Sequence, residues 1–160
     1  MNAAGIDFGV RRIAIVQLGE RTDYIEDVLP KKQYPVGEAN DPLALEAIYD
    51  SVFTTISIWK PDLVVIEAPI QGISVNVKVG LRLAMVAGVL AVACRHAGSS
   101  TLSVGPTEWK KAVVGVGNAN KDAISGWLTA SYPGIASNCF SQDLVDAACM
   151  ALYAQIVLGR

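Results

Sequence analysis

Four carboxylates stand inside or beside strongly apolar segments of this 160-residue chain. Asp7 and Glu67 each end an apolar run, and Asp143 and Asp146 lie at the start of another. Burying an ionised carboxylate without a partner is costly, so several such groups in one fold imply compensating cations. The simplest compensating cation is a bound divalent metal ion.

Carboxylate oxygens are hard ligands that suit Mg²⁺ or Mn²⁺, and no His or Cys competes for that role. Asp143 and Asp146 have the i,i+3 spacing that places two side chains on one face of a helix. Two such ions about 3.5–4 Å apart hold the attacking water and the leaving oxygen during phosphodiester hydrolysis. The four acids therefore predict a nuclease.

Each acid also has a plain structural interpretation. Asp7 could stabilise a turn at Gly9, Glu67 could face solvent at a strand end, and Asp143 could be favoured by a helix dipole. Asp146 is harder to explain in this way, because only apolar residues follow it for a full turn. Since all four interpretations would have to coincide in one topology, we favour the metal site.

The elements that must position these acids follow from apolar periodicity and from turn and cap residues. We expect strands at residues 3–8, 13–18, 24–29, 63–66 and 101–104, and helices at 41–59, 79–97, 107–114, 121–131 and 143–158, with a loop at 69–77 and irregular chain at 133–141. Asp41, Thr107 and Asn120 are the expected caps of their helices. This order predicts an α/β fold of one domain, with a five-stranded mixed sheet of three antiparallel and then two parallel strands flanked by helices.

Composition sets limits on partners and location. Hydrophobic residues make up 52% of the chain, which excludes general disorder, and the formal charge of −2 argues only weakly against nucleic acid, because two divalent ions would reverse its sign. The longest uncharged apolar run, residues 83–94, is too short to span a bilayer, and we expect no leader segment at the start of the chain. Cys94, Cys139 and Cys149 lack metal-ligand spacing and suit buried thiols in a reducing compartment. We expect a cytoplasmic protein with no membrane partner.

Several segments occur in a distinctive order: Gly5-Ile6-Asp7-Phe8-Gly9, Val65-Ile66-Glu67, Lys78-Val79-Gly80, Lys110-Lys111-Ala112-Val113-Val114-Gly115-Val116-Gly117-Asn118-Ala119-Asn120-Lys121, and Asp143-Leu144-Val145-Asp146-Ala147-Ala148. In this ordered set the chain resembles RuvC-type Holliday junction resolvases of the ribonuclease H-like superfamily. The resemblance implies a homodimer that cuts two strands of a four-way junction symmetrically, and that acts on other branched DNA such as flaps and forks, in a bacterial or phage-infected cell.

The resemblance also implies roles for individual residues. Asp7, Glu67, Asp143 and Asp146 would hold two Mg²⁺ ions, with Mn²⁺ as a substitute, while Lys121 and Lys110 would stabilise charge on the scissile phosphate. The expected DNA contacts are Arg11, Arg12, Ile70, Gln71, Ile73, Ser74, Asn76, Lys78, Arg82, Lys111, Gly115 and Gly117. Ile70 or Ile73 would be an apolar wedge where the family often has an aromatic residue, or else an ordinary surface side chain.

Alternatives remain open from the sequence. Gly115 and Gly117 could admit DNA or form a plain turn, and the helix at 79–97 could be a dimer seam or a core helix. Trp109 could stack on a base or pack internally, and His96 is expected at a helix end and not in catalysis. The rival functions are a monomeric RNA-processing nuclease of the same fold, a non-catalytic junction-binding module, and a sugar-kinase-like ATPase domain, for which 160 residues leave no second domain.

Overall fold

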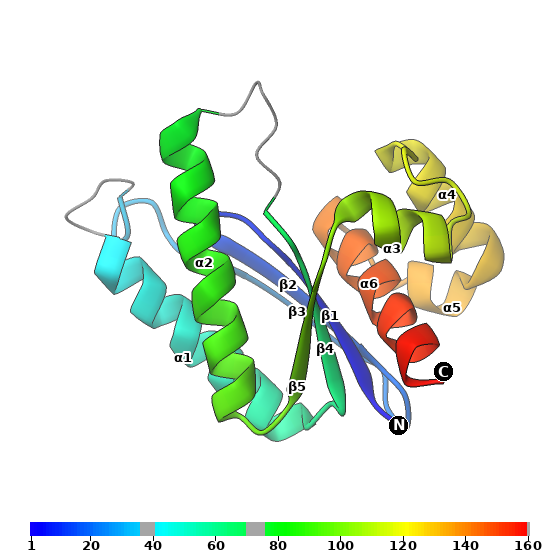
Figure 1. Cartoon of the computed structure of the whole chain (residues 1–160), viewed down its shortest axis with the longest axis horizontal. Coiled ribbons are helices and arrows are strands. Elements are labelled where there is room, and N and C mark those ends of the chain that lie inside the picture. Colours follow the sequence, from blue (N-terminus) through cyan, green and yellow to red (C-terminus); the bar gives the residue numbers. More distant parts are fainter. Residues whose placement is uncertain (36–40, 70–75, 160) are drawn as a thin grey trace.

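A computed structural model describes residues 1–35, 41–69 and 76–159, and shows one sheet between two helical layers (Figure 1). Four of the expected DNA contacts, Ile70, Gln71, Ile73 and Ser74, lie outside the described residues.

The sheet has five strands: β1 (Ala3–Phe8), β2 (Arg12–Leu18), β3 (Asp23–Val28), β4 (Leu63–Glu67) and β5 (Ser100–Val104). They lie in the order β3-β2-β1-β4-β5. The first three pair antiparallel, and β4 joins β1 and β5 in parallel. The predicted mixed sheet is confirmed, and β1 and β4 are adjacent at its centre, as expected for the strands that carry two of the acids.

The helices divide between the two faces of the sheet (Figure 1). One face carries α1 (Asp41–Trp59) and α2 (Val77–His96), and the other carries α3 (Pro106–Val113), α4 (Lys121–Ser131), α5 (Pro133–Ala136) and α6 (Gln142–Leu158). α6 lies directly on the sheet and is buried along most of its length. Each face has its own apolar core, so both layers are held by burial of hydrophobic surface.

Strand alternation sorts the side chains between the two cores. Ile6 and Ile13 pack with α1 and α2, whereas Ala3 and Ala14 pack with α6. Because successive strand residues point to opposite faces, Asp7 projects from β1 on the α6 side.

Two local predictions were wrong. The N-cap of α3 is Gly105 and not Thr107, because Pro106 occupies the first helical position, where its missing N–H costs nothing. The stretch 133–141, expected to be irregular, contains the four-residue helix α5, which also begins with a proline. The helix expected at 79–97 also begins earlier, at Val77, because the Asn76 side chain caps it by accepting a hydrogen bond from the backbone N–H of Lys78 at 3.0 Å.

Among the described helices, α2 alone is long and apolar enough to cross a membrane, with a mean hydropathy of 1.9 over its best window. α2 extends beyond the uncharged run of residues 83–94 considered above, because this measure of hydropathy allows a few charged residues within the segment. One such helix is weak evidence for a membrane span, since core helices share the property. Here Val86, Leu90, Ala93 and Cys94 are buried on the sheet side of α2.

Candidate active site

The approach of α6 to the sheet depends on Gly5 in β1. A Cβ atom at this position would lie 2.1 Å from the carbonyl oxygen of Ala147 and 2.5 Å from the backbone nitrogen of Ala151. Only glycine permits such close packing of helix on strand. The contact brings the first turns of α6, with Asp143 and Asp146, beside the end of β1.

The register of the two central strands brings the other two acids together. Gly5 pairs with Val65 and Ile6 with Ile66 in parallel, so Asp7 and Glu67 follow at the same edge of the sheet. Because strand side chains alternate between the two faces, the side chains of both acids point to the face that α6 covers. The predicted convergence of the four acids at one end of the sheet therefore follows from register and from the Gly5 contact.

Asp7 lies at the electrostatic centre of this group. Burial and the neighbouring carboxylates of Asp146, Asp143 and Glu67 raise its pKa to about 8. The backbone N–H of Phe8, which donates to Asp7 Oδ1 at 3.0 Å, opposes the shift. The four carboxylates are therefore close enough to interact electrostatically.

Glu67 is held by a buried tryptophan. Trp109 is fully buried, and its Nε1–H donates to Glu67 Oε2 at 2.7 Å. Burial raises the pKa of Glu67, whereas this hydrogen bond lowers it. Of the two alternatives left open for Trp109, internal packing is therefore confirmed. No local pattern in the sequence signals its bond to Glu67, because α3 and β4 meet only in the folded chain.

Asp146 is oriented by a short polar chain on two helices. Gln142 Nε2 donates to Asp146 Oδ1 at 2.9 Å, and Ser125 Oγ on α4 donates to Gln142 Oε1 at 3.1 Å. Burial raises the pKa of Asp146, and the Gln142 bond together with the charges of Lys110 and Lys121 lowers it. Gln142 was missed in the sequence, although its i,i+4 spacing from Asp146 was a readable signal.

Asp143 forms an ion pair with Arg12, the first residue of β2. The Asp143 side chain is 13% exposed and that of Arg12 is 54% exposed. Ser141 caps the helix just before Asp143 by accepting from the backbone N–H of Leu144 at 3.2 Å. Arg12, expected to contact DNA, therefore lies at the acid cluster itself.

The donor set fits a hard divalent cation. All four side chains are carboxylates, and their mutual repulsion is what a cation between them would relieve. In the described part of the chain, no three Asp, Glu, His or Cys side chains are already arranged so that they could hold a metal ion. One oxygen of Glu67 accepts from Trp109 and leaves the other free, whereas Asp143 is paired with Arg12, which a cation at the cluster would have to displace.

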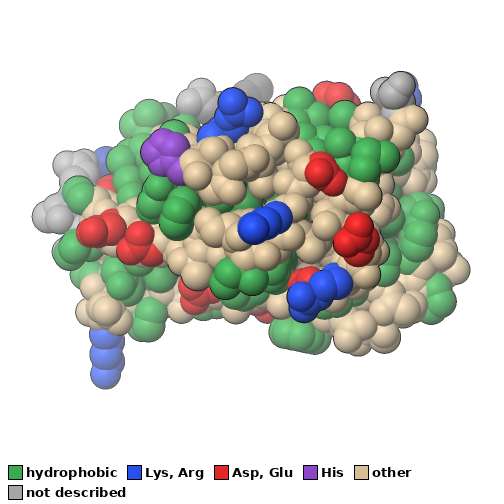
Figure 2. Space-filling model, turned by 90° about the horizontal axis from the view of Figure 1, so that it is seen from below, with side chains coloured by type: hydrophobic (Ala, Val, Ile, Leu, Met, Phe, Trp, Pro, Cys, Tyr) green, Lys and Arg blue, Asp and Glu red, His purple; other side chains and the backbone are tan. Residues whose placement is uncertain are grey.

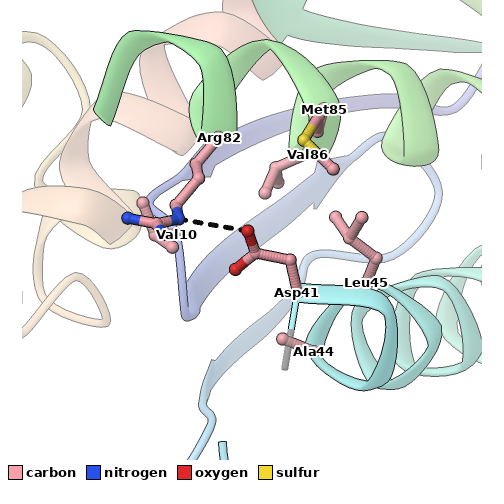
Figure 3. Close-up of a pocket in the computed structure, with 7 residues that line it drawn as sticks. All are labelled: Val10, Asp41, Ala44, Leu45, Arg82, Met85 and Val86. Atoms are coloured by element: carbon pink, nitrogen blue, oxygen red, sulfur yellow. Dashed lines mark hydrogen bonds and ion pairs between the residues drawn. The ribbon is translucent and has the colours of Figure 1, made fainter. Parts of the chain in front are cut away.

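The other cationic residues that are expected to contact DNA differ in exposure and in pairing. Arg82 pairs with Asp41 at 3.2 Å between α2 and α1, beside a small pocket that Val10 helps to line (Figure 3). Both side chains are only 16% exposed, so the charge of Arg82 is already used within the fold. Lys78 and Lys111 are exposed.

The two glycines of the segment before α4 have structural requirements of their own. Gly115 has a φ of +89°, a conformation that other residues rarely adopt. Gly117 lies against α3, where a Cβ would come within 2.8 Å of Thr107 Cγ2. Both positions thus form the turn between α3 and α4. As expected, His96 ends α2, and its Nδ1 lies 2.8 Å from the hydroxyl of Tyr49.

Comparisons with known proteins identify the family to which the chain belongs. A family profile described as crossover junction endodeoxyribonuclease RuvC matches residues 4–153. Curated relatives of that name include one from Pelobacter propionicus, which is 30% identical over 93% of this chain and 85% of its own length. Another, from Salinibacter ruber, is 31% identical over 69% of this chain and 60% of its own length.

Two solved structures share the fold. Thermus thermophilus RuvC in complex with a Holliday junction substrate has a TM-score of 0.77 at 19% identity, over 99% of this chain and 96% of its own. The yeast mitochondrial Holliday junction resolvase Ydc2 has a TM-score of 0.60 at 17% identity, over 92% of this chain and 75% of its own. With the family profile covering nearly the whole chain, this protein belongs to the crossover junction endodeoxyribonuclease RuvC family.

Proposed function

We propose that this RuvC-family endonuclease resolves Holliday junctions, and acts on related branched DNA, with two Mg²⁺ ions held by Asp7, Glu67, Asp143 and Asp146. The observation that carries the proposal is the convergence of four carboxylates at one end of the sheet, where burial and the three other acids raise the pKa of Asp7. Bound divalent ions would supply an activated water and a clamp on the leaving oxygen.

The chain's own residues would prepare the site for this chemistry. Trp109 fixes one oxygen of Glu67, and Gln142 fixes one oxygen of Asp146, so each acid keeps its other oxygen for a cation. Lys110 and Lys121 lie within electrostatic reach of Asp146. Both would stabilise negative charge that develops on the phosphate in the transition state.

The DNA would bind at the end of the molecule that carries the acids. Seen from the opposite end, Lys and Arg side chains stand singly among acidic, apolar and neutral ones (Figure 2). A duplex needs several adjacent cations to neutralise its phosphates. The scattered charges of this far end therefore support binding at the acid-bearing end.

A second copy of the chain would pack on α2. The exposed residues Val77, Leu81, Met85 and Val92 are spaced at four, four and seven positions, so they form one stripe opposite the buried face of the helix. An exposed apolar stripe of this kind marks an interaction surface. A two-fold dimer would present two active sites related as the two strands to be cut.

Side-by-side incubation with labelled four-way junctions, flaps, duplex DNA and RNA–DNA hybrids in Mg²⁺ tests the substrate class. The proposal predicts cleavage of junctions, and of flaps more weakly, with little cleavage of plain duplex. Cleavage of RNA-containing substrates by a monomer would instead support the rival RNA-processing nuclease. Junction binding without any cleavage would support the binding module.

A further inference from the structure

A basic groove lies next to the acid cluster, between the β1–β2 turn and the chain at the end of β3. It has a volume of about 290 Å³ and is lined by residues 9–12 of the β1–β2 turn together with Val28, Leu29 and Lys31. Three of these lining residues, Arg11, Arg12 and Lys31, are cations, and none of the lining residues that the structure describes is acidic.

Main-chain hydrogen bonds fix the shape of this groove. Gly9 N–H donates to the carbonyl of Arg12 at 2.7 Å, and Leu29 N–H donates to the carbonyl of Arg11 at 2.8 Å. The Arg11 side chain is tied in turn to the carbonyl of Tyr34 at 3.3 Å. The groove is therefore largely preformed, which lowers the entropic cost of binding a ligand.

Arg12 belongs to both the groove and the acid cluster. Its guanidinium pairs with Asp143, yet half of the side chain is exposed and lines the groove. A divalent cation bound at the four acids would take over the neutralisation of Asp143 and would repel the guanidinium at the same time. Arg12 would then need a new anion, and a guanidinium matches the geometry of a phosphate well.

We propose that this groove binds a backbone phosphate of the DNA substrate next to the acids, and that Arg12 exchanges Asp143 for that phosphate when divalent metal is bound. The inference rests on the proposed function, since it assumes a DNA substrate and a metal at the acids. Arg12 is then a positioning residue that couples metal loading to DNA docking. Metal binding and DNA binding should therefore change in opposite directions when Arg12 is replaced.

Arg12→Gln is the test, because glutamine keeps polarity and removes the charge. Without DNA, the variant should bind Mn²⁺ about 2- to 5-fold more tightly than wild type, since a half-exposed competing ion pair is worth up to about 1 kcal/mol. With Ca²⁺ as a metal expected not to support cleavage, it should bind four-way junctions more weakly. The slope of log affinity against log salt should fall by about 0.9, the value for one phosphate contact.

Two further variants make the test decisive. Arg21→Gln removes an arginine that is 77% exposed and paired with Asp23, just beyond the opposite end of β2, and it should leave both affinities unchanged. Arg12→Lys should restore most of the salt slope, because it restores the charge. A variant that merely folds badly would lose affinity for Mn²⁺ and for the junction together.

The inference is overturned if Arg12→Gln binds Mn²⁺ no more tightly than wild type, or if its salt slope for junction binding is unchanged. An unchanged slope would mean that Arg12 moves elsewhere, for example to Glu26, the β3 residue paired with Ala14 on the same face. If wild type cuts junctions in Mg²⁺ but the slope is unchanged, this inference alone fails. If wild type neither binds nor cuts junctions, the proposed function fails as well.

Discussion

Trp109 donates its indole N–H to Glu67 across 2.7 Å, and thereby ties α3 to the end of the central strand β4. The indole is fully buried, so no water can replace Glu67 as its acceptor. The bond therefore has two roles: it satisfies a buried donor, and it orients a carboxylate proposed to bind metal.

Trp109→Phe keeps an aromatic ring, but it removes the N–H donor together with part of the side-chain volume. The loss of a buried hydrogen bond to a charged group should destabilise the fold by roughly 1.5–3 kcal/mol, and a lost outer-shell contact should lower metal-dependent cleavage by about 10- to 100-fold. Because the bond lowers the pKa of Glu67, the rise of cleavage with pH should move to higher pH. Cleavage rates against pH for wild type and variant measure this.

Trp127→Phe is the matched control. Trp127 of α4 packs against Tyr132, the C-cap residue of that helix, and no recorded contact joins Trp127 to the acids. Its pH profile should coincide with that of wild type. An unshifted profile for Trp109→Phe would show that the hydrogen bond does not tune Glu67.

The acid cluster should make the metal-free protein less stable as pH rises. An unfolded aspartate titrates near 3.8 and folded Asp7 at about 8, so between these values the folded state retains a proton that the unfolded state releases. The free energy of unfolding therefore falls from about pH 4 to pH 8. The raised pKa values of Glu67 and Asp146 act in the same direction.

Asp7→Asn should flatten this dependence and raise stability at pH 8, while abolishing cleavage. Urea unfolding in EDTA at a series of pH values, at fixed protein concentration, measures the slope. Asp50→Asn, at an exposed position of α1, should leave the slope unchanged. An equal fall in Asp7→Asn and wild type would show that Asp7 does not carry the shifted proton.

Gly5→Ala should separate α6 from β1. The added methyl group would clash with backbone atoms of Ala147 and Ala151, which cannot turn away as a side chain can. Overpacking of this kind costs about 1–3 kcal/mol or more, and the acids on α6 would move from those on β1 and β4. We expect a lower melting temperature and a large loss of cleavage.

Gly126→Ala provides the control for this change. Gly126 lies inside α4, and a Cβ there would meet no atom within 4 Å. Alanine in a helix interior should stabilise the protein by about 0.5–1 kcal/mol and leave cleavage unchanged. Wild-type activity in Gly5→Ala would mean that the α6 contact does not set the geometry of the site.

The α2 stripe gives a prediction about assembly. Leu81→Glu places a charge in the proposed interface, so the mass in solution should change from two chains to one. Paired cutting of opposite junction strands should be lost with it. Ile156→Glu alters an exposed apolar residue of α6, in the other helical layer, and should leave the mass unchanged. A wild-type protein that is already monomeric would contradict the proposed dimer.

The sequence predicted the sheet and the positions of the acids because both depend on local signals. Apolar runs end at Asp7 and Glu67, and the i,i+3 spacing puts Asp143 and Asp146 on one helical face. The Gly5 contact was also readable in principle, since a glycine inside an apolar strand marks close approach. Thr107 failed as a cap because Gly105, followed by Pro106, starts the helix first.

Other features depend on long-range packing and left no local signal. The Trp109–Glu67 bond joins residues 42 positions apart, and the Arg12–Asp143 pair joins the second strand to the last helix. Nor does the chain reveal that Arg82, which is predicted to contact DNA, pairs with Asp41 on another helix. These interactions required the three-dimensional arrangement.

Cleavage of a strand-labelled four-way junction by wild type and Asp7→Asn, with Mg²⁺ and with EDTA, tests the central claim most directly. We predict paired cuts in two opposite strands by wild type in Mg²⁺, with none in EDTA and none by Asp7→Asn. Cuts that persist in EDTA or in Asp7→Asn, or a junction left intact by wild type in both Mg²⁺ and Mn²⁺, would contradict it.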